Sequence, residues 1–168
     1  MKRNLLLLLI NFFSGLNTVY CQDINGTYAI KNVQTGIFIR IKDANSKNGT
    51  PIVAYSPVNW KCVTWDFKKQ NGNFYQLVNL FSNKTLQPSA IAKEGTAMEE
   101  QPLVLGNTAQ QYKFIPVEKN VYLIKLKGTE LYLCPSDSEG NINNPIILKP
   151  NNNSRLQYWQ LKEQHPEI

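Results

Sequence analysis

Apolar and polar residues alternate in short runs along most of this chain. Tyr28 and Ile30 are followed, at the same spacing of two, by Ile37, Ile39 and Ile41. Similar alternation recurs over residues 122–126 and 131–133. Such alternation, rich in β-branched and aromatic residues, is typical of strands with one buried face. Clusters rich in Asn, Ser and Gly at 45–49, 71–73, 136–144 and 151–154 separate the runs and predict turns. The pattern predicts an all-β fold.

The pattern is also periodic over a longer distance. Tyrosines stand 47 residues apart at Tyr28, Tyr75 and Tyr122. Two further sets keep this step, namely Trp65, Tyr112 and Trp159, and Ile39, Leu86 and Leu133. Three independent markers on one period indicate one structural unit written three times. The repeats fall at about residues 26–70, 72–117 and 119–163.

Each copy has room for about four short strands. We expect the third strand to follow a proline, at Pro51, Pro102 and Pro145. This proline lies 23, 27 and 23 residues after the opening tyrosine and 14, 10 and 14 residues before the closing aromatic, so the middle copy gains four residues in one loop and loses four in the next. One copy alone cannot bury its apolar face, whereas three around an axis close a barrel without exposed edges. The aromatic residues predicted to form the barrel core are Tyr28, Tyr75, Tyr122, Trp65 and Trp159.

A short motif closes each copy. The third copy ends in Gln157-Tyr158-Trp159, the second in the softened Gln110-Gln111-Tyr112, and the first in Val63-Thr64-Trp65. The first of these is a Gln-x-Trp sequence, and the chain from Gly26 to about Lys162 resembles the ricin B-type β-trefoil lectins. The resemblance implies a β-trefoil of three pseudo-symmetric repeats. It also implies a carbohydrate-binding module without catalytic activity.

The resemblance also implies where sugar is held in each repeat. The four positions carry an aspartate in the second strand, a polar residue, an aromatic platform, and an asparagine before the Gln-x-Trp glutamine. Copy one has Arg40, Val53, Tyr55 and Cys62 at these positions. Copy two has Gln87, Val104, Gly106 and Ala109, and copy three has Cys134, Ile147, Lys149 and Leu156. Only Tyr55 fits its role, so the usual sites are degenerate.

Copy one is nevertheless the best candidate for a displaced carbohydrate site. Tyr55 is the platform in this hypothesis, and Trp60 lies in the loop that follows it. The polar candidates are Asp43, Asn45, Asn59 and Arg40. The alternative is structural, because Asp43 and Asn45 are also typical turn residues and Tyr55 can simply cover a hairpin. A common cleft around Tyr55, Trp60 and Asp43 would favour sugar binding, and burial of Tyr55 under residues 90–101 would not.

Residues 1–21 have the features of a secretory signal peptide. Lys2 and Arg3 precede an apolar stretch that is too short to span a bilayer. Residues 22–168 then form a single secreted domain, with a lipid anchor at Cys21 as the second interpretation. Without residues 1–21, the formal charge falls from +6 to +4. The lysines are scattered, so we expect neither a nucleic-acid partner nor a membrane span.

Catalytic chemistry has little support in the sequence. The one histidine, His165, lies outside the repeats, so neither a Cys–His pair nor a metal site is expected. Glu99 and Glu100 are adjacent in a predicted loop and make a poor acid–base couple. We expect no cofactor. Whether Cys62 and Cys134 pair stays open, and N-glycosylation sequons occur at Asn25, Asn48, Asn83 and Asn152.

The sequence leaves three functional hypotheses. The first is a secreted monomeric module that binds a glycan or polysaccharide through copy one. The second is a trefoil that has lost sugar binding and recognises a protein partner, as an inhibitor or a ligand. The third, which the sequence favours least, is a former targeting module of an enzyme that now stands alone.

Overall fold

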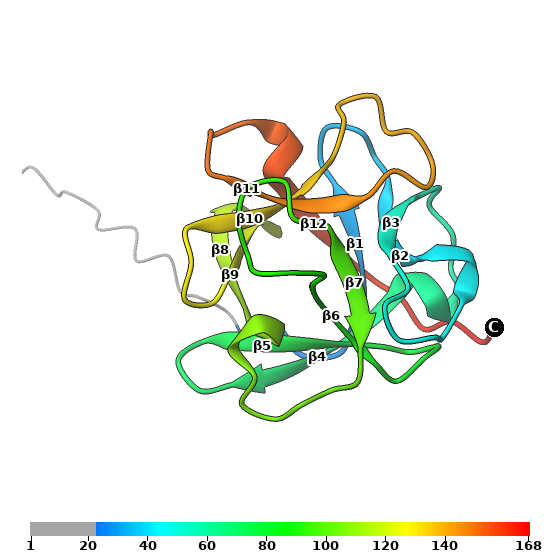
Figure 1. Ribbon diagram of the computed structural model, residues 1–168. Coiled ribbons are helices and arrows are strands. Elements are labelled where there is room, and N and C mark those ends of the chain that lie inside the picture. Colours follow the sequence, from blue (N-terminus) through cyan, green and yellow to red (C-terminus); the bar gives the residue numbers. More distant parts are fainter. Residues whose placement is uncertain (1–22) are drawn as a thin grey trace, which may run out of the picture.

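The computed structural model describes residues 23–168, so the predicted signal peptide lies outside the described residues. The chain folds into strands joined by turns and short 3-10 helices (Figure 1). Lobe one contains β1 (Thr27–Asn32), β2 (Phe38–Ile41), β3 (Ile52–Tyr55) and β4 (Thr64–Gln70). Lobe two contains β5 (Phe74–Asn79), β6 (Thr85–Pro88), β7 (Met98–Gln101) and β8 (Tyr112–Glu118). Lobe three contains β9 (Val121–Leu126), β10 (Leu131–Pro135), β11 (Ile146–Pro150) and β12 (Tyr158–Glu163). The prediction of about four strands per repeat is confirmed.

Six of these strands close a barrel. β1 pairs with β4, β4 with β5, β5 with β8, β8 with β9, β9 with β12 and β12 with β1, all antiparallel. The other six form the hairpins β2–β3, β6–β7 and β10–β11, one in each lobe. A closed ring leaves no barrel strand with a free edge. The predicted all-β trefoil architecture is therefore confirmed.

The residues with the 47-residue period form the core of this barrel. Trp65 and Trp159 each donate an indole N–H, at 3.3 and 2.9 Å, to the carbonyl of Ile39 and Leu133. Tyr112 donates its hydroxyl to the Leu86 carbonyl at 2.9 Å. These three aromatic residues are fully buried. Each thus joins the last strand of its lobe to the second strand of the same lobe.

The opening tyrosines line the barrel interior and pack against Phe67 and Phe114. Tyr75 is buried, and Tyr28 and Tyr122 are partly buried against the core. Ile24 is also buried, and its backbone N–H donates to the Tyr75 hydroxyl at 3.0 Å. The segment that precedes β1 therefore packs into the core.

The third strand of lobe two is not where the sequence predicted it. β7 covers Met98–Gln101 and pairs with β6 so that Gln87 faces Glu99. The same register places Arg40 opposite Val53 in lobe one and Cys134 opposite Ile147 in lobe three. Glu99 is therefore the equivalent of Val53 and Ile147, and Gln101 that of Tyr55 and Lys149. Residues 90–101 are not one long loop, and Glu99 and Glu100 lie in a strand.

Pro102 is not the equivalent of Pro51 and Pro145, contrary to the prediction from the sequence. The Gln110 side chain donates to the Pro102 carbonyl at 2.9 Å, and the Gln157 side chain donates to the Pro150 carbonyl at 2.8 Å. Pro102 thus corresponds to Pro150, which follows the strand, and not to Pro145, which precedes it. The apolar run after Pro102 resembles a buried strand in sequence, but it lies in an exposed loop where Leu105 is 82% exposed. The predicted exchange of four residues between two loops is wrong.

Each hairpin is held against the next lobe by main-chain hydrogen bonds. The Glu100 N–H donates to the Thr50 carbonyl at 2.8 Å, and the Gly49 N–H donates to the Glu100 carbonyl at 2.9 Å. Equivalent bonds join Leu148 to Thr96 and Ala54 to Asn144. The turn between β2 and β3 is therefore held on β7.

Replacing Trp159 by Phe tests the buried hydrogen bond. Trp159→Phe removes the donor and leaves the Leu133 carbonyl unsatisfied in the core, which costs about 1–3 kcal/mol. We expect this loss in the free energy of unfolding measured in urea. Trp60→Phe, at a position 38% exposed, is the control and should change stability by less than about 0.5 kcal/mol. Equal effects of the two substitutions would contradict this account of the core.

Candidate functional site

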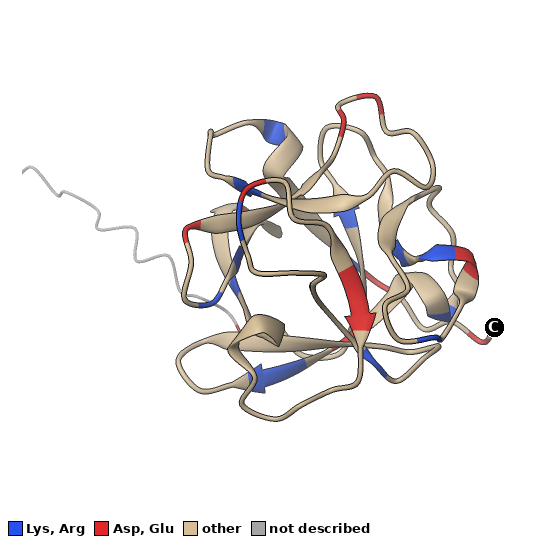
Figure 2. Ribbon diagram, in the orientation of Figure 1, with Lys and Arg blue, Asp and Glu red and all other residues tan. Residues whose placement is uncertain are grey.

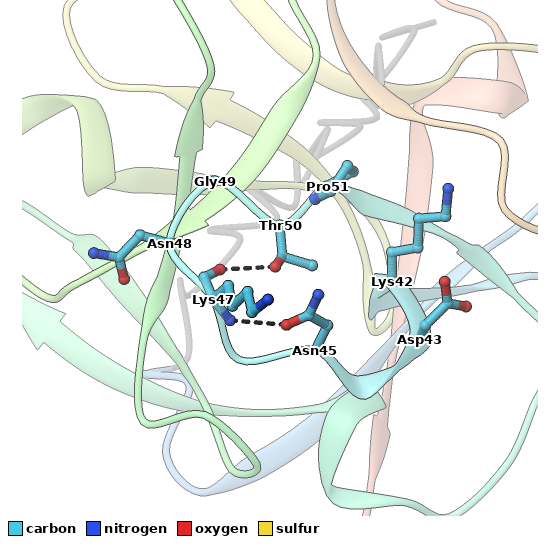
Figure 3. A pocket seen from close by; sticks show the side chains of 8 residues that line it. All are labelled: Lys42, Asp43, Asn45, Lys47, Asn48, Gly49, Thr50 and Pro51. Atoms are coloured by element: carbon cyan, nitrogen blue, oxygen red, sulfur yellow. Dashed lines mark hydrogen bonds between the residues drawn. The ribbon is translucent and has the colours of Figure 1, made fainter.

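The turn between β2 and β3 is held by internal hydrogen bonds and contains two residues with positive φ. A 3-10 turn, η1 (Lys42–Ala44), follows β2, and Asp43 and Ala44 have φ values of 54° and 47°. Few residues with a Cβ adopt such values, and they often occur at functional sites. Asn45 Oδ1 accepts from the Lys47 N–H at 3.1 Å, and the Thr50 hydroxyl donates to the Lys47 carbonyl at 2.7 Å (Figure 3). These bonds fix the turn without ligand.

This turn borders an open polar hollow with a volume of about 390 Å³, which we call the lobe-one hollow. Its lining residues are Lys42, Asp43, Asn45, Lys47, Asn48, Gly49, Thr50 and Pro51. Figure 3 shows Lys47 and Asn45 directed into the ring that these residues form, with Asn48 pointing away. The hollow offers a carboxylate, an amide, ammonium groups and a hydroxyl. It therefore combines hydrogen-bond donors with acceptors.

Tyr55 and Arg40 pack together beside this hollow. The guanidinium carbon of Arg40 lies 3.6 Å from the centre of the Tyr55 ring. Arg40 is 6% exposed and donates to Asp43 Oδ1 and to Asn143 Oδ1, both at 3.2 Å. A guanidinium on an aromatic face is a cation–π contact. One face of the predicted platform is thus occupied by Arg40.

The predicted site residues divide between two hollows. Asp43 and Asn45 line the lobe-one hollow. Trp60 lines a second hollow, with a volume of about 200 Å³, which we call the aromatic hollow. Its lining residues are Ala44, Trp60, Lys61, Cys62, Phe81 and Ile168. Asn59 is exposed in the loop beside Trp60, and Tyr55 packs against lobe-one residues. The six candidates lie in one lobe but do not share a single cleft.

Several residues of this region carried no recognisable signal in the sequence. Asn143, which fixes Arg40, comes from the β10–β11 loop of lobe three. Its role depends on how two lobes pack, which local sequence does not reveal. Phe81 lies at the β5–β6 turn and reaches the aromatic hollow across the lobe boundary. Lys42, Lys47 and Thr50 were detectable only as part of a polar turn.

The equivalent positions in lobes two and three are poor in sugar-binding groups. With the corrected register, lobe two has Gln87, Glu99, Gln101 and Ala109. Gln101 donates to Glu99 at 2.8 Å, and Gln110 donates to Gln87 at 2.9 Å, so these amides bond within the lobe. In lobe three, Cys134 is buried, and burial raises the pKa of its thiol to about 11, against the opposing influence of Lys149.

Glu100 is an unusual neighbour of the lobe-one hollow. Its carboxyl group is fully buried, and neither oxygen has a hydrogen-bond partner within residues 23–168. The equivalent positions hold Ala54 and Leu148. Burial raises the pKa of Glu100, and the nearby Ser82 and Lys84 offset part of that shift. The Lys84 ammonium also donates to the Ser46 carbonyl of the turn.

Other kinds of site find no support in residues 23–168. No group of His, Cys, Asp and Glu in this range has the arrangement of a metal site. Cys62 and Cys134 are both buried free thiols. Basic and acidic positions are interspersed over the three lobes (Figure 2). The described residues also contain no helix that is long and apolar enough to cross a membrane.

The fold and the motif-bearing core define a β-trefoil of the lectin type. The chain belongs to the ricin-type β-trefoil lectin domain-like family, whose model matches residues 18–100 and 61–149. Comparison of the sequence with curated proteins gives no match.

Several solved structures share this fold. The designed threefold-symmetric protein ThreeFoil superposes with a TM-score of 0.79 and 17% identity, covering 83% of this chain and 99% of its own. The Rhizoctonia solani agglutinin gives 0.76 and 21% identity, with 85% and 98% covered. The Macrolepiota procera ricin B-like lectin, solved with lactose, gives 0.72 and 20% identity, with 84% and 99% covered. At these identities the likeness establishes the fold.

The pKa of Glu100 predicts how stability depends on pH. Because this pKa is raised in the folded state, the folded chain binds the proton more tightly than the unfolded chain does. The stability that Glu100 contributes is thus present below the ordinary glutamate pKa, about 4.3, and is lost as the pH rises through the folded value. Glu100→Gln should therefore gain in Tm relative to the native protein as the pH increases from about 4 to about 8.

The control for this experiment is Glu94→Gln, an exposed glutamate in the β6–β7 loop. Its Tm should follow that of the native protein at every pH. Parallel Tm profiles for Glu100→Gln and the native protein would show that Glu100 does not titrate differently in the two states.

Proposed function

We propose that this chain is a secreted carbohydrate-binding module without catalytic activity, and that it binds sugar in the lobe-one hollow. The observation that carries the proposal is the hollow itself, a fixed turn that presents both hydrogen-bond donors and acceptors. Membership of the lectin-like family supports it. So do relatives of the same fold, since one was solved with lactose and an earthworm R-type lectin with GalNAc.

The chemistry of the hollow suits sugar hydroxyls. A hydroxyl group both donates and accepts a hydrogen bond, and hydrogen bonds to charged groups are the stronger ones. Asp43 can accept from a sugar hydroxyl, whereas Lys47 and the amide NH₂ of Asn45 can donate to one. Because hydrogen bonds within the turn already fix its shape, little conformational freedom is lost on binding.

The family's usual positions are proposed to be inactive. In lobe one, the Arg40 guanidinium lies on the ring that would otherwise stack on sugar. In lobes two and three, Gln101 and Lys149 replace the aromatic platform. Absence of catalysis is proposed on similar grounds, because the carboxylate in the hollow, Asp43, is paired with Arg40.

One observation favours protein recognition as the second candidate function. Leu103, Val104 and Leu105 are consecutive and are 38%, 53% and 82% exposed. Apolar residues exposed in a row are more typical of a protein contact than of a sugar site. A protein partner would then bind lobe two.

A glycan array with matched variants tests the proposed site. Lys47→Ala removes an exposed donor, and Asp43→Asn removes a carboxylate at a positive φ that Asn tolerates. Each should weaken binding by about ten-fold, since a charged hydrogen bond contributes about 1.5 kcal/mol. Lys93→Ala, an exposed lysine of lobe two, and Tyr55→Phe, which keeps the ring under Arg40, should bind as the native protein does.

Two outcomes would count against this proposal. Undiminished binding by both hollow variants would exclude the lobe-one hollow. Absence of binding to any glycan would favour the protein-recognition candidate, which Leu105→Asp then tests through loss of partner capture.

Secretion is proposed from residues 1–21 and is tested separately. Cleavage after Cys21 leaves Gln22 as the first residue and retains the buried Ile24. Expression of the full chain in a secreting host should give a soluble product. Its intact mass should match a chain that begins at Gln22. A lipid-modified Cys21 in the membrane fraction would support the anchored form instead.

A further inference from the structure

We propose that the lobe-one site takes an oligosaccharide of at least two units, with one unit in the lobe-one hollow and the next stacked in the aromatic hollow. This inference rests on the proposed function and specifies its ligand class. Its basis is that the two hollows adjoin at a single turn. Asp43 and Asn45 line the first hollow, and Ala44 between them lines the second. A ligand that crosses Ala44 reaches both.

The two hollows differ in chemistry. The lobe-one hollow is lined mainly by charged and amide side chains. The aromatic hollow exposes only apolar atoms, with Trp60 38% and Phe81 43% exposed. A pyranose unit has hydroxyl groups at its edge and a C–H face that packs on aromatic rings. Two linked units can therefore place hydroxyls in the first hollow and a C–H face in the second.

Trp60 stands where the other lobes have a capping residue. The 3-10 turn η3 (Thr108–Gln110) is preceded by Asn107, whose side chain accepts from the Ala109 N–H. The turn η4 (Arg155–Gln157) is preceded by Ser154, which accepts from the Leu156 N–H. In lobe one, Trp60 precedes η2 (Lys61–Val63) and provides no side-chain cap. A residue that would stabilise the turn has been replaced by an exposed indole.

The backbone at Trp60 is nevertheless well held. Its carbonyl accepts from the Thr64 hydroxyl at 2.8 Å and from the Val63 N–H at 3.2 Å. Trp60 is 38% exposed, and its indole ring lies beside the Tyr55 ring, with the ring centroids 6.1 Å apart. An anchored main chain with a partly exposed ring is the arrangement of a stacking platform.

Phe81 faces the same hollow from lobe two. The Phe81 N–H donates to Asn79 Oδ1 at 3.0 Å, and in lobe one the Gln34 N–H donates in the same way to Asn32 Oδ1 at 3.1 Å. Lobe one thus has an exposed glutamine where lobe two has an exposed phenylalanine. The aromatic hollow therefore combines two exceptions to the threefold pattern, Trp60 from lobe one and Phe81 from lobe two.

The test measures how affinity depends on oligosaccharide length. Galactose and lactose, N-acetylglucosamine and chitobiose, and glucose and cellobiose are titrated by calorimetry against the native protein. In the series that binds, the disaccharide should bind about ten-fold more tightly than the monosaccharide, the affinity change expected for one additional aromatic contact. Trp60→Ser introduces the residue found in lobe three, so it should keep or raise the Tm while abolishing the ten-fold gain.

Two further variants distinguish the contributions of the two hollows to affinity. Phe81→Ala should reduce the gain with chain length and leave monosaccharide affinity within two-fold of native. Lys47→Ala should weaken monosaccharide and disaccharide equally. The inference would be overturned if the native protein bound monosaccharide and disaccharide with equal affinity. It would also be overturned if Trp60→Ser lost affinity equally for both. Neither result would argue against sugar binding in the lobe-one hollow.

Two other results would also overturn it. If octyl galactoside gains affinity over galactose but lactose does not, the aromatic hollow takes an apolar aglycone and not a sugar. If no sugar in any series binds, the proposed function itself fails, and the oligosaccharide inference fails with it.

Discussion

The structure depends on burying three large aromatic residues that each carry a polar hydrogen. Trp65, Tyr112 and Trp159 are fully buried, and a buried N–H or O–H without an acceptor is costly. Each finds its acceptor in the main-chain carbonyl of the second strand of its own lobe. This bond joins a barrel strand to a hairpin strand, and its repetition in three lobes holds the three hairpins on the barrel. Any change that displaces the aromatic ring therefore disturbs both layers.

The fold was predictable from the core aromatic residues, which the need for a buried hydrogen-bond acceptor keeps at equivalent positions in the three lobes. The 47-residue period is visible because core positions tolerate little change, and it was sufficient to predict the barrel. It failed at β7, where Glu99 and Glu100 do not look like a strand while the apolar run after Pro102 does. For the candidate site, the sequence indicated the lobe but not how its residues are arranged in space. The contact of Arg40 with Asn143 joins residues 103 apart, and no local pattern records such a contact.

The tolerance for polar residues at β7 has a physical explanation. The turn of lobe one is bound to this strand through the backbone of Glu100, with Thr50 and Gly49 as partners. Main-chain bonds of this kind do not depend on which side chain the strand carries. The equivalent bonds at Ala54 and Leu148 hold with small and large apolar side chains alike. A buried carboxyl group can therefore occupy this position of β7 without altering the position of the turn.

Several departures from threefold symmetry lie in lobe one, at the end of β2, in the β2–β3 turn and in the loop after β3. Arg40 stands where lobes two and three have Gln87 and Cys134, Trp60 stands where they have capping residues, and Asp43 adopts a positive φ. Each change weakens local structure or consumes a partner that a simple repeat would keep. The association of these changes with two adjoining hollows of complementary polarity is the physical reason to locate ligand binding there, and to expect a ligand with both hydroxyl groups and an apolar face.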